Sequence, residues 1–167
     1  LATAPPGSVV ELSPAGAAVA RDIGRRLARD GGAALLVDYG HAVPGPGETL
    51  QAVRRHGFAP VLEAPGEADL TAHVDFAALA AAARAGGAAA WGPVPQGAFL
   101  KALGIEERAR RLSARATPGQ AEAIAQALAR LLDPGAMGTL FKALALTGPD
   151  LGPPAGFEPA PDPAPNP

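Results

Sequence analysis

Residues 31–40 have the sequence GGAALLVDYG, and this stretch decides the fold class. Two glycines end the segment before it, and the five residues that follow are all apolar. A short apolar run without alternation is typical of a strand buried on both faces, as in a parallel sheet. The run ends in Asp38, Tyr39 and Gly40, so polar side chains stand at the carboxyl end of the predicted strand.

The segment upstream predicts a strand followed by a helix. Residues 8–12 (SVVEL) are apolar and β-branched, which favours a strand. Ser13 and Pro14 then form a good helix start, with a hydroxyl N-cap followed by proline at the first helical position. The helix is expected to end at the glycine pair of residues 31–32. Strand, helix and buried strand in succession predict an α/β layer fold.

The segment downstream carries most of the polar candidates. Residues 49–55 predict a short helix, after a loop rich in proline and glycine. Residues 69–76 (DLTAHVDF) alternate strictly, and in an extended segment one face would carry Asp69, Thr71, His73 and Asp75. A helix over residues 76–85 follows, with Asp75 as its N-cap.

The second half predicts one more strand and several helices. The strand is expected at 88–91, and the first two helices at 96–103 and 105–115, broken at Gly104. Thr117 and Gln120 form a capping-box pattern that opens another helix. Residues 139–146 (TLFKALAL) form an apolar run whose period alone does not separate helix from strand.

Composition narrows the class of protein. With 48% hydrophobic and 18% charged residues the 167-residue chain is typical of a soluble globular domain. Its net charge of −2 argues against a dedicated nucleic-acid binder, and no apolar run approaches the ~20 residues of a membrane span. The absence of cysteine excludes thiolate chemistry. We expect a folded unit over residues 1–150 and a disordered, proline-rich tail over 151–167.

The order of the motifs resembles one family. The series is 11–14 (ELSP), 31–40 (GGAALLVDYG), 49–52 (TLQA), 65–76 (PGEADLTAHVDF), 92–100 (GPVPQGAFL) and 137–146 (MGTLFKALAL). Together these segments resemble the C-terminal half of the MidA-type methyltransferases that use S-adenosyl-L-methionine (SAM). Relatives in that family include the mitochondrial arginine methyltransferases that act in the assembly of respiratory complex I.

The resemblance implies the C-terminal part of a Rossmann-like class I methyltransferase with a mostly parallel sheet. Residues 33–38 would form a central strand, and residues 139–146 a final antiparallel strand preceded by a helical insertion. The family's glycine-rich cofactor loop lies upstream of the matching part. Because the chain starts at Leu1 rather than at a methionine, we expect an incomplete fragment that is inactive alone. The cofactor-binding residues are expected mainly in the N-terminal half that this chain does not match.

The glycines present here are a poor substitute for that loop. Gly40, Gly45 and Gly47 follow the predicted strand, but Pro44 and Pro46 lie among them. Proline removes N–H donors and does not adopt positive φ, so this loop is a poor cradle for a cofactor. The chain alone is therefore predicted to bind SAM weakly or not at all.

An arginine-directed site needs acids, because a guanidinium stays protonated at neutral pH and must be oriented and relieved of a proton. The catalytic candidates are Asp38, Asp69 and Asp75. The substrate-binding candidates are Glu11, Tyr39, His73 and Gln96. Several of these have simpler roles open to them: Asp38 as an acceptor for the following turn, Asp75 as a helix cap, and His73 as a half-buried, hydrogen-bonded side chain. His41 and His56 are expected at the surface, and no metal site is expected.

Three functions remain open. The first is a methyltransferase that acts on a protein, for instance a respiratory complex I subunit, with a cytoplasmic location outside the mitochondrial relatives. The second is a non-catalytic scaffold that grips a partner through the helices between residues 96 and 133. The third is a metal-dependent hydrolase built on Asp69, His73 and Asp75, which lacks a complete ligand set.

Overall fold

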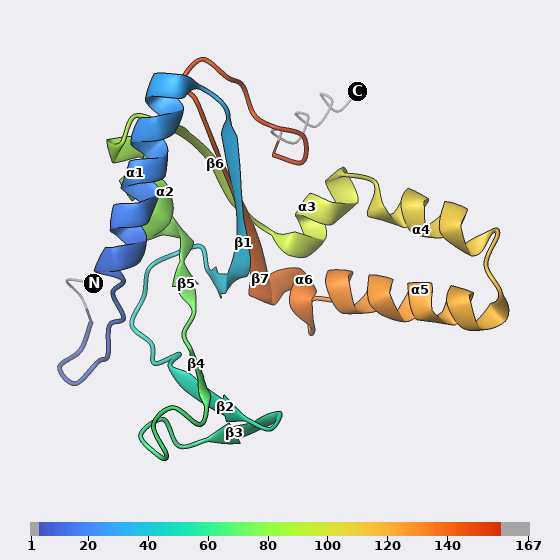
Figure 1. Ribbon diagram of the computed structural model, residues 1–167, viewed down its shortest axis with the longest axis horizontal. Helices are drawn as coiled ribbons and strands as arrows, with labels where there is room; N and C mark the ends of the chain where they lie inside the picture. Colours follow the sequence, from blue (N-terminus) through green and yellow to red (C-terminus); the bar gives the residue numbers. More distant parts are fainter. Residues whose placement is uncertain (1–3, 158–167) are drawn as a thin grey trace, which may run out of the picture.

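The computed structural model describes residues 4–157 and shows a mixed α/β chain (Figure 1). In chain order the elements are α1 (Pro14–Asp30), β1 (Ala33–His41), β2 (Gln51–Arg54), β3 (Gly57–Ala59), β4 (Asp69–Thr71), β5 (Val74–Asp75), α2 (Phe76–Ala85), β6 (Ala89–Pro95), α3 (Gln96–Ala102), α4 (Ile105–Ser113), α5 (Pro118–Leu132), α6 (Met137–Leu140) and β7 (Phe141–Thr147). Among the described residues, none of these helices combines the length and the apolar character that crossing a membrane requires.

The main sheet has the strand order β5-β1-β7-β6. β7 is antiparallel to both of its neighbours, β1 and β6, as predicted for the last strand. The expectation of a mostly parallel sheet is wrong for these residues, because only β1 and β5 pair in parallel, at Gly40↔Val74 and His41↔Asp75. The cause is the position of β7: it separates β1 from β6, which run in the same direction, so most of the ladders are antiparallel.

Strand β1 is buried on one face only, which corrects the prediction of burial on both. Ala34 and Leu36 pack against the core, whereas Leu35 is 54% exposed and Val37 is 46% exposed. In addition, β5 reaches only the last two residues of β1. Among residues 4–157, the edge of β1 away from β7 has no other strand beside it. β1 is therefore an inner strand at its carboxyl end and an edge strand before it.

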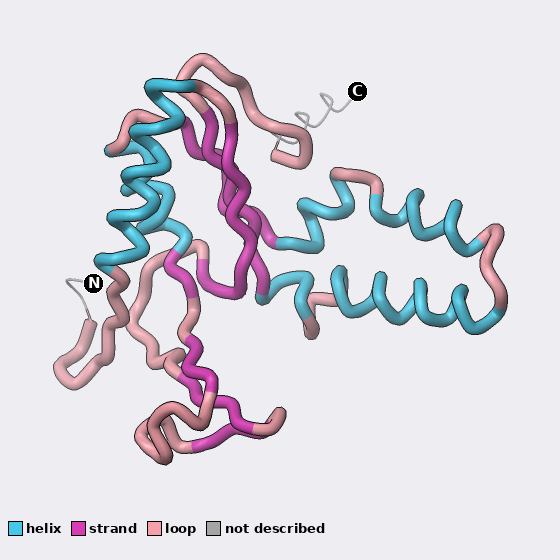
Figure 2. Tube along the Cα trace, viewed as in Figure 1, coloured by secondary structure: helices cyan, strands magenta, loops and turns pink. Residues whose placement is uncertain are grey.

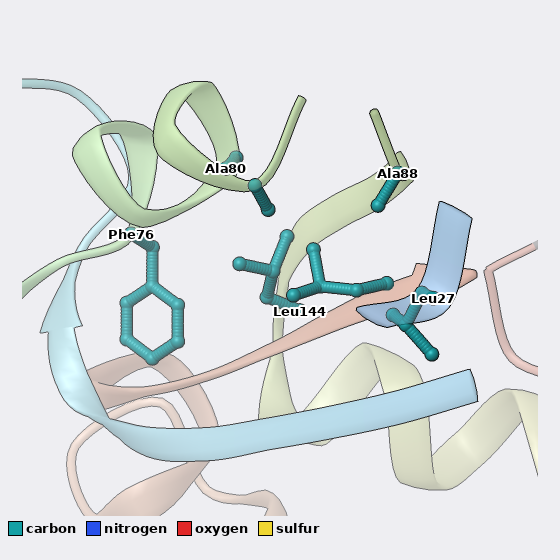
Figure 3. Packing of buried hydrophobic residues seen from close by; sticks show 7 residues of the cluster. Leu27, Phe76, Ala80, Ala88 and Leu144 are labelled. Atoms are coloured by element: carbon teal, nitrogen blue, oxygen red, sulfur yellow. The ribbon is translucent and has the colours of Figure 1, made fainter. Parts of the chain in front are cut away.

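Helices α1 and α2 cover one face of the sheet and enclose the main core (Figure 3). Phe76, Leu144 and Leu146 are each less than 2% exposed there. The two helices approach closely through glycine: a Cβ added to Gly24 would lie 2.3 Å from the Ala83 carbonyl oxygen. A second cluster on the opposite face of the sheet joins Phe99 and Phe157 to Ala143 and Ala145 of β7.

The three predicted helix caps, at Ser13, Asp75 and Thr117, are confirmed. The Ser13 hydroxyl accepts a hydrogen bond from the Gly16 N–H, and Asp75 Oδ1 accepts one from the Ala78 N–H at 2.9 Å. Thr117 and Gln120 form the predicted capping box. Each such cap stabilises a helix by about 1 kcal/mol, and each depends on residues within one turn of the helix start.

Two predicted elements are wrong. Residues 8–12 are not a strand, because the Val9 carbonyl accepts from the Gly47 N–H and the Glu11 side chain binds the following loop instead. Residues 49–55 are not a helix: Gln51–Arg54 form β2 in a separate three-stranded sheet of order β3-β2-β4. The pairing of β2 with two strands overrides its local helix preference. In the alternating segment 69–76, residues 69–71 form β4 and residues 74–75 form β5, while Phe76 begins α2.

Helices α3 to α6 lie between β6 and β7, as the predicted insertion does. Gly104 separates α3 from α4 in a left-handed conformation with φ of 81°. α4 and α5 together form an arm that extends away from the sheet (Figure 2). Residues 151–157 of the predicted tail are described, and Phe157 is only 8% exposed. The expected disorder of 158–167 lies outside the described residues.

Candidate functional site

Five chain segments, β1 among them, meet at the carboxyl end of β1. They contribute five residues that form one connected group, here called the Thr49 cluster: Glu11, Tyr39, Thr49, His73 and Phe141. Glu11 lies on the coil before α1, Thr49 before β2, His73 between β4 and β5, and Phe141 at the start of β7. The cluster therefore joins parts of the chain that are far apart in sequence.

Glu11 anchors the loop before β2. Its Oε1 accepts hydrogen bonds from the backbone N–H groups of Thr49, at 2.8 Å, and Leu50, at 3.0 Å. Its Oε2 accepts a short hydrogen bond from the Thr49 hydroxyl. These bonds favour the ionised carboxylate and lower the pKa of Glu11 below its usual value, the Thr49 hydroxyl being the largest cause. Through these three hydrogen bonds, Glu11 holds the loop before β2 in place.

Thr49 is the link that sequence analysis missed. Its hydroxyl donates to Glu11 and accepts a hydrogen bond of 2.8 Å from the His73 N–H. One hydroxyl can do both because it carries a donor and two acceptor lone pairs. The sequence offered only a threonine at the start of a wrongly predicted helix, and nothing there indicated a contact with residue 11 or residue 73.

Tyr39 lies between two other rings. Its centroid is 5.8 Å from that of His73 and 5.5 Å from that of Phe141, at interplanar angles of 69° and 76°. These edge-to-face contacts are a preferred aromatic geometry and hold Tyr39 in a fixed place. Two of the predicted substrate-binding residues, Tyr39 and His73, are therefore in direct contact, and Glu11 is connected to them through Thr49.

Asp38 and Asp75 lie near the same end of β1 but make other contacts. Asp38 is exposed, and within the described residues its side chain makes a single hydrogen bond, from the Tyr39 N–H at 2.8 Å. Because strand residues alternate, Asp38 is on the face of Leu36 and Tyr39 is on the opposite face. Asp75 caps α2 and is half-buried. Of these two acids, Asp38 has more of its carboxylate free to meet a ligand.

Lys142 and His41 complete this end of the sheet. Lys142 is opposite Asp38 in the β1–β7 register, and its Nζ donates to the Gly40 carbonyl oxygen at 3.0 Å. Burial lowers the pKa of Lys142 because the charged ammonium loses water. His41, expected at the surface, is half-buried, and its Nδ1 is buried without a hydrogen-bond partner among the described residues.

Asp69 and Gln96 lie elsewhere. Asp69 is exposed on β4 of the three-stranded sheet. Gln96 is 6% exposed, and its Nε2 donates to the Leu131 carbonyl oxygen at 3.1 Å, which joins α3 to α5. Within residues 4–157, no three His, Asp or Glu side chains are grouped as a metal site would require. The hydrolase hypothesis based on Asp69, His73 and Asp75 therefore has no assembled site.

Gly40, near the end of β1, and Gly47, after β1, are used in packing and in a backbone hydrogen bond, which decides whether these residues fit SAM. A Cβ added to Gly40 would lie 2.1 Å from the Val74 carbonyl oxygen, so glycine is needed there for the approach of β5. The Gly47 N–H donates to the Val9 carbonyl oxygen and is not free for a ligand. These residues do not form a glycine-rich cofactor cradle.

Residues 1–94 match the family model described as "Putative S-adenosyl-L-methionine-dependent methyltransferase". This chain belongs to that family. The family's cofactor is S-adenosyl-L-methionine, as its description states.

Two curated relatives are mitochondrial proteins. The human one is named "Protein arginine methyltransferase NDUFAF7", and the fly one is named as its homolog. The Drosophila melanogaster protein is 42% identical over 125 residues, which are 74% of this chain and 28% of the relative. The Homo sapiens protein is 38% identical over 138 residues, which are 82% of this chain and 31% of the relative.

Two solved structures from Burkholderia thailandensis are similar in fold to this chain. An uncharacterised COG1565 superfamily protein is 27% identical with a TM-score of 0.70, over 93% of this chain and 42% of that one. A second superfamily member, bound to S-adenosyl-homocysteine, is 30% identical with a TM-score of 0.65. That match covers 86% of this chain and 36% of the other. The chain spans about a third of the length of the curated relatives named above.

Proposed function

We propose that this chain is the acceptor-binding part of a SAM-dependent protein arginine methyltransferase. The observation that supports this most is the Thr49 cluster at the carboxyl end of β1. In α/β sheets, ligands bind beyond the carboxyl ends of the strands, where the loops of several segments meet. Here that place combines acids with fixed aromatic rings, and the family is one of methyltransferases.

The chemistry assigns different tasks to the acids. A protonated guanidinium must be oriented by carboxylates, and one nitrogen must lose its proton as the new N–C bond forms. Asp38 lies on the other face of β1 from Tyr39, at the same carboxyl end, and it is the first candidate for this task because its carboxylate makes a single hydrogen bond within residues 4–157. Asp75 and Asp69 are the next candidates. Glu11 is a positioning residue that acts through Thr49, and Tyr39 and His73 would flank the substrate. SAM supplies the methyl group when it is bound.

The cofactor is proposed to bind mainly outside residues 4–157. Gly40 and Gly47 are engaged in packing and hydrogen bonding, as described above. Before Gly40, the edge of β1 away from β7 has no partner strand among residues 4–157, which suggests that β1, β7 and β6 belong to a larger Rossmann-like sheet in the complete enzyme. Residues 1–167 alone are then expected to be inactive and to bind SAM weakly. A one-to-one complex of micromolar affinity in a calorimetric titration would contradict this part of the proposal.

Gln96 is retained only as a distant substrate-binding candidate, since its hydrogen bond to the Leu131 carbonyl oxygen holds two helices together. The methyl acceptor is proposed to be a protein, because the curated relatives are named protein arginine methyltransferases. A respiratory complex I subunit as that acceptor, and a cytoplasmic location, stay predictions.

A labelling experiment tests the proposed function. The complete reading frame that contains this chain is incubated with methyl-tritiated SAM and a protein extract, and the labelled protein is hydrolysed to amino acids. We expect the label in methylarginine, and SAM should raise the melting temperature of the protein. Label in another amino acid would exclude arginine as the acceptor. A protein that SAM neither stabilises nor labels would instead be a scaffold.

A further inference from the structure

The arm formed by α4 and α5 has an incompletely covered apolar face. Neither helix contains a buried residue. Apolar side chains nevertheless recur at helical spacing, at Ile105, Ala109 and Leu112 on α4 and at Ile124, Leu128 and Leu131 on α5. This spacing places each set on one stripe of its helix. Leu112, at the far end of α4, is 49% exposed.

The two stripes line a cavity of about 260 Å³, here called the arm groove. Its lining is apolar except for one charged residue, Arg108. The other lining residues are Ile105, Ala109, Leu112, Ile124, Ala127, Leu128 and Leu131. Two antiparallel helices with an open apolar seam present the surface onto which a third helix packs in a bundle.

Arginines surround the exposed end of this groove. Arg108 lines the groove itself, and Arg111 and Arg115 line hollows that adjoin Leu112. Glu107 forms ion pairs with Arg110 and Arg111, whereas Arg108 and Arg115 form no ion pair among the described residues. The rim is therefore positively charged next to an apolar floor, which fits a partner that is apolar on one stripe and acidic beside it.

We propose that the arm groove binds an acidic amphipathic helix of a partner protein. The apolar stripe of the partner helix would cover Leu112, Ile124 and Leu128, and the acidic side chains of that helix would meet Arg108 and Arg115. A nucleic acid would satisfy the arginines but leave the apolar floor uncovered. A second copy of the arm would bring like-charged arginines together across a two-fold contact. This surface is distinct from the Thr49 cluster and does not depend on the proposed enzymatic function.

The test uses the complete reading frame and a designed peptide. The probe is a 16-residue helical peptide with leucines at positions i, i+4, i+7 and i+11 and glutamates on both flanks. Its matched partner has lysines in place of the glutamates. Fluorescence anisotropy should show saturable binding of the glutamate peptide, at least tenfold weaker binding of the lysine peptide, and weakening of the former with salt. Equal binding of both peptides, or binding of neither, overturns the proposal.

Three variants locate the site. Leu112→Asp and Arg108→Glu should each weaken binding of the glutamate peptide at least tenfold. Arg130→Glu is the control: it makes the same charge change on α5, but Arg130 does not line the groove, and less than a twofold effect is expected. Equal effects of Arg108→Glu and Arg130→Glu would overturn the proposal. The proposal would also be overturned if the protein dimerised and Leu112→Asp abolished the dimer, or if other residues of the protein already covered the groove.

Discussion

The sheet layer and the arm contain similar apolar residues but bury them to different extents. Around the sheet, Phe76, Leu144 and Leu146 are less than 2% exposed, and glycines bring α1 and α2 into close contact. In the arm, α4 and α5 bury no residue fully and line the open arm groove instead. The sheet layer is thus held by packing, while the arm depends on its caps and on local ion pairs. We infer that the first region provides stability and the second provides an adaptable surface.

The largest expected effect is in the core of the sheet layer. Phe76→Ala should lower the free energy of unfolding by about 3–5 kcal/mol, because it removes a fully buried aromatic ring. Leu112→Ala is the matched change in the arm, and it should cost less than about 1 kcal/mol because half of that side chain is already exposed. Urea unfolding measures both. Equal losses would mean that the two regions do not differ in packing.

Glycine substitutions provide a second contrast. Gly24→Ala should destabilise the protein by about 1–3 kcal/mol, because its Cβ would lie 2.3 Å from the Ala83 carbonyl oxygen and force α1 and α2 apart. Gly119→Ala in α5 meets no atom within 4 Å and should stabilise that helix by about 0.5–1 kcal/mol. Thermal unfolding should therefore show shifts of opposite sign. A stabilising Gly24→Ala would disprove the close packing of α1 and α2.

The capping box should matter locally. Thr117→Ala removes the hydroxyl that accepts from the Gln120 N–H and should cost α5 about 1 kcal/mol. Hydrogen exchange should become faster in α5 and stay unchanged in β1 and β7. Faster exchange throughout the sheet would show that the arm and the sheet unfold together.

The smallest effect concerns Glu11 and pH. Its pKa is lower in the folded protein than its ordinary value of 4.5, so its ionised form stabilises the fold at neutral pH. That contribution is complete above the unfolded pKa and is lost as pH falls through the folded pKa, below 4.5. The stability difference between wild type and Glu11→Gln should therefore shrink as the solution is acidified from pH 6. A difference that grows on acidification would contradict the assigned ionised state.

Local signals were predictable from the sequence, and non-local pairing was not. The caps at Ser13, Asp75 and Thr117 were predicted because each involves residues one turn away. The helix predicted over residues 49–55 failed because Ala52 pairs with Leu70, which no short window contains. Likewise, the antiparallel character of most ladders follows from the pairing of Ala33 with Thr147.

The candidate site divides in the same way. The position of Asp38 and Tyr39 at the carboxyl end of a strand could be predicted from the apolar run before them, and the family resemblance drew attention to Glu11 and His73. The connection between Glu11 and Thr49 spans 38 residues and arises only when the loop folds back onto the coil before α1. Lys142 was missed because its contact with Gly40 depends on the insertion of β7 beside β1.

The most direct test of the carboxyl end of β1 compares two aspartate variants of the complete reading frame. Asp38→Asn changes the freest acid at that end, and Asp150→Asn changes an exposed acid beyond Thr147, where β7 pairs with the start of β1. Methyl transfer and melting temperature are measured for both. We expect Asp38→Asn to lower turnover at least tenfold, with the melting temperature of both variants close to that of wild type. Unchanged turnover in Asp38→Asn would remove Asp38 from the proposed site.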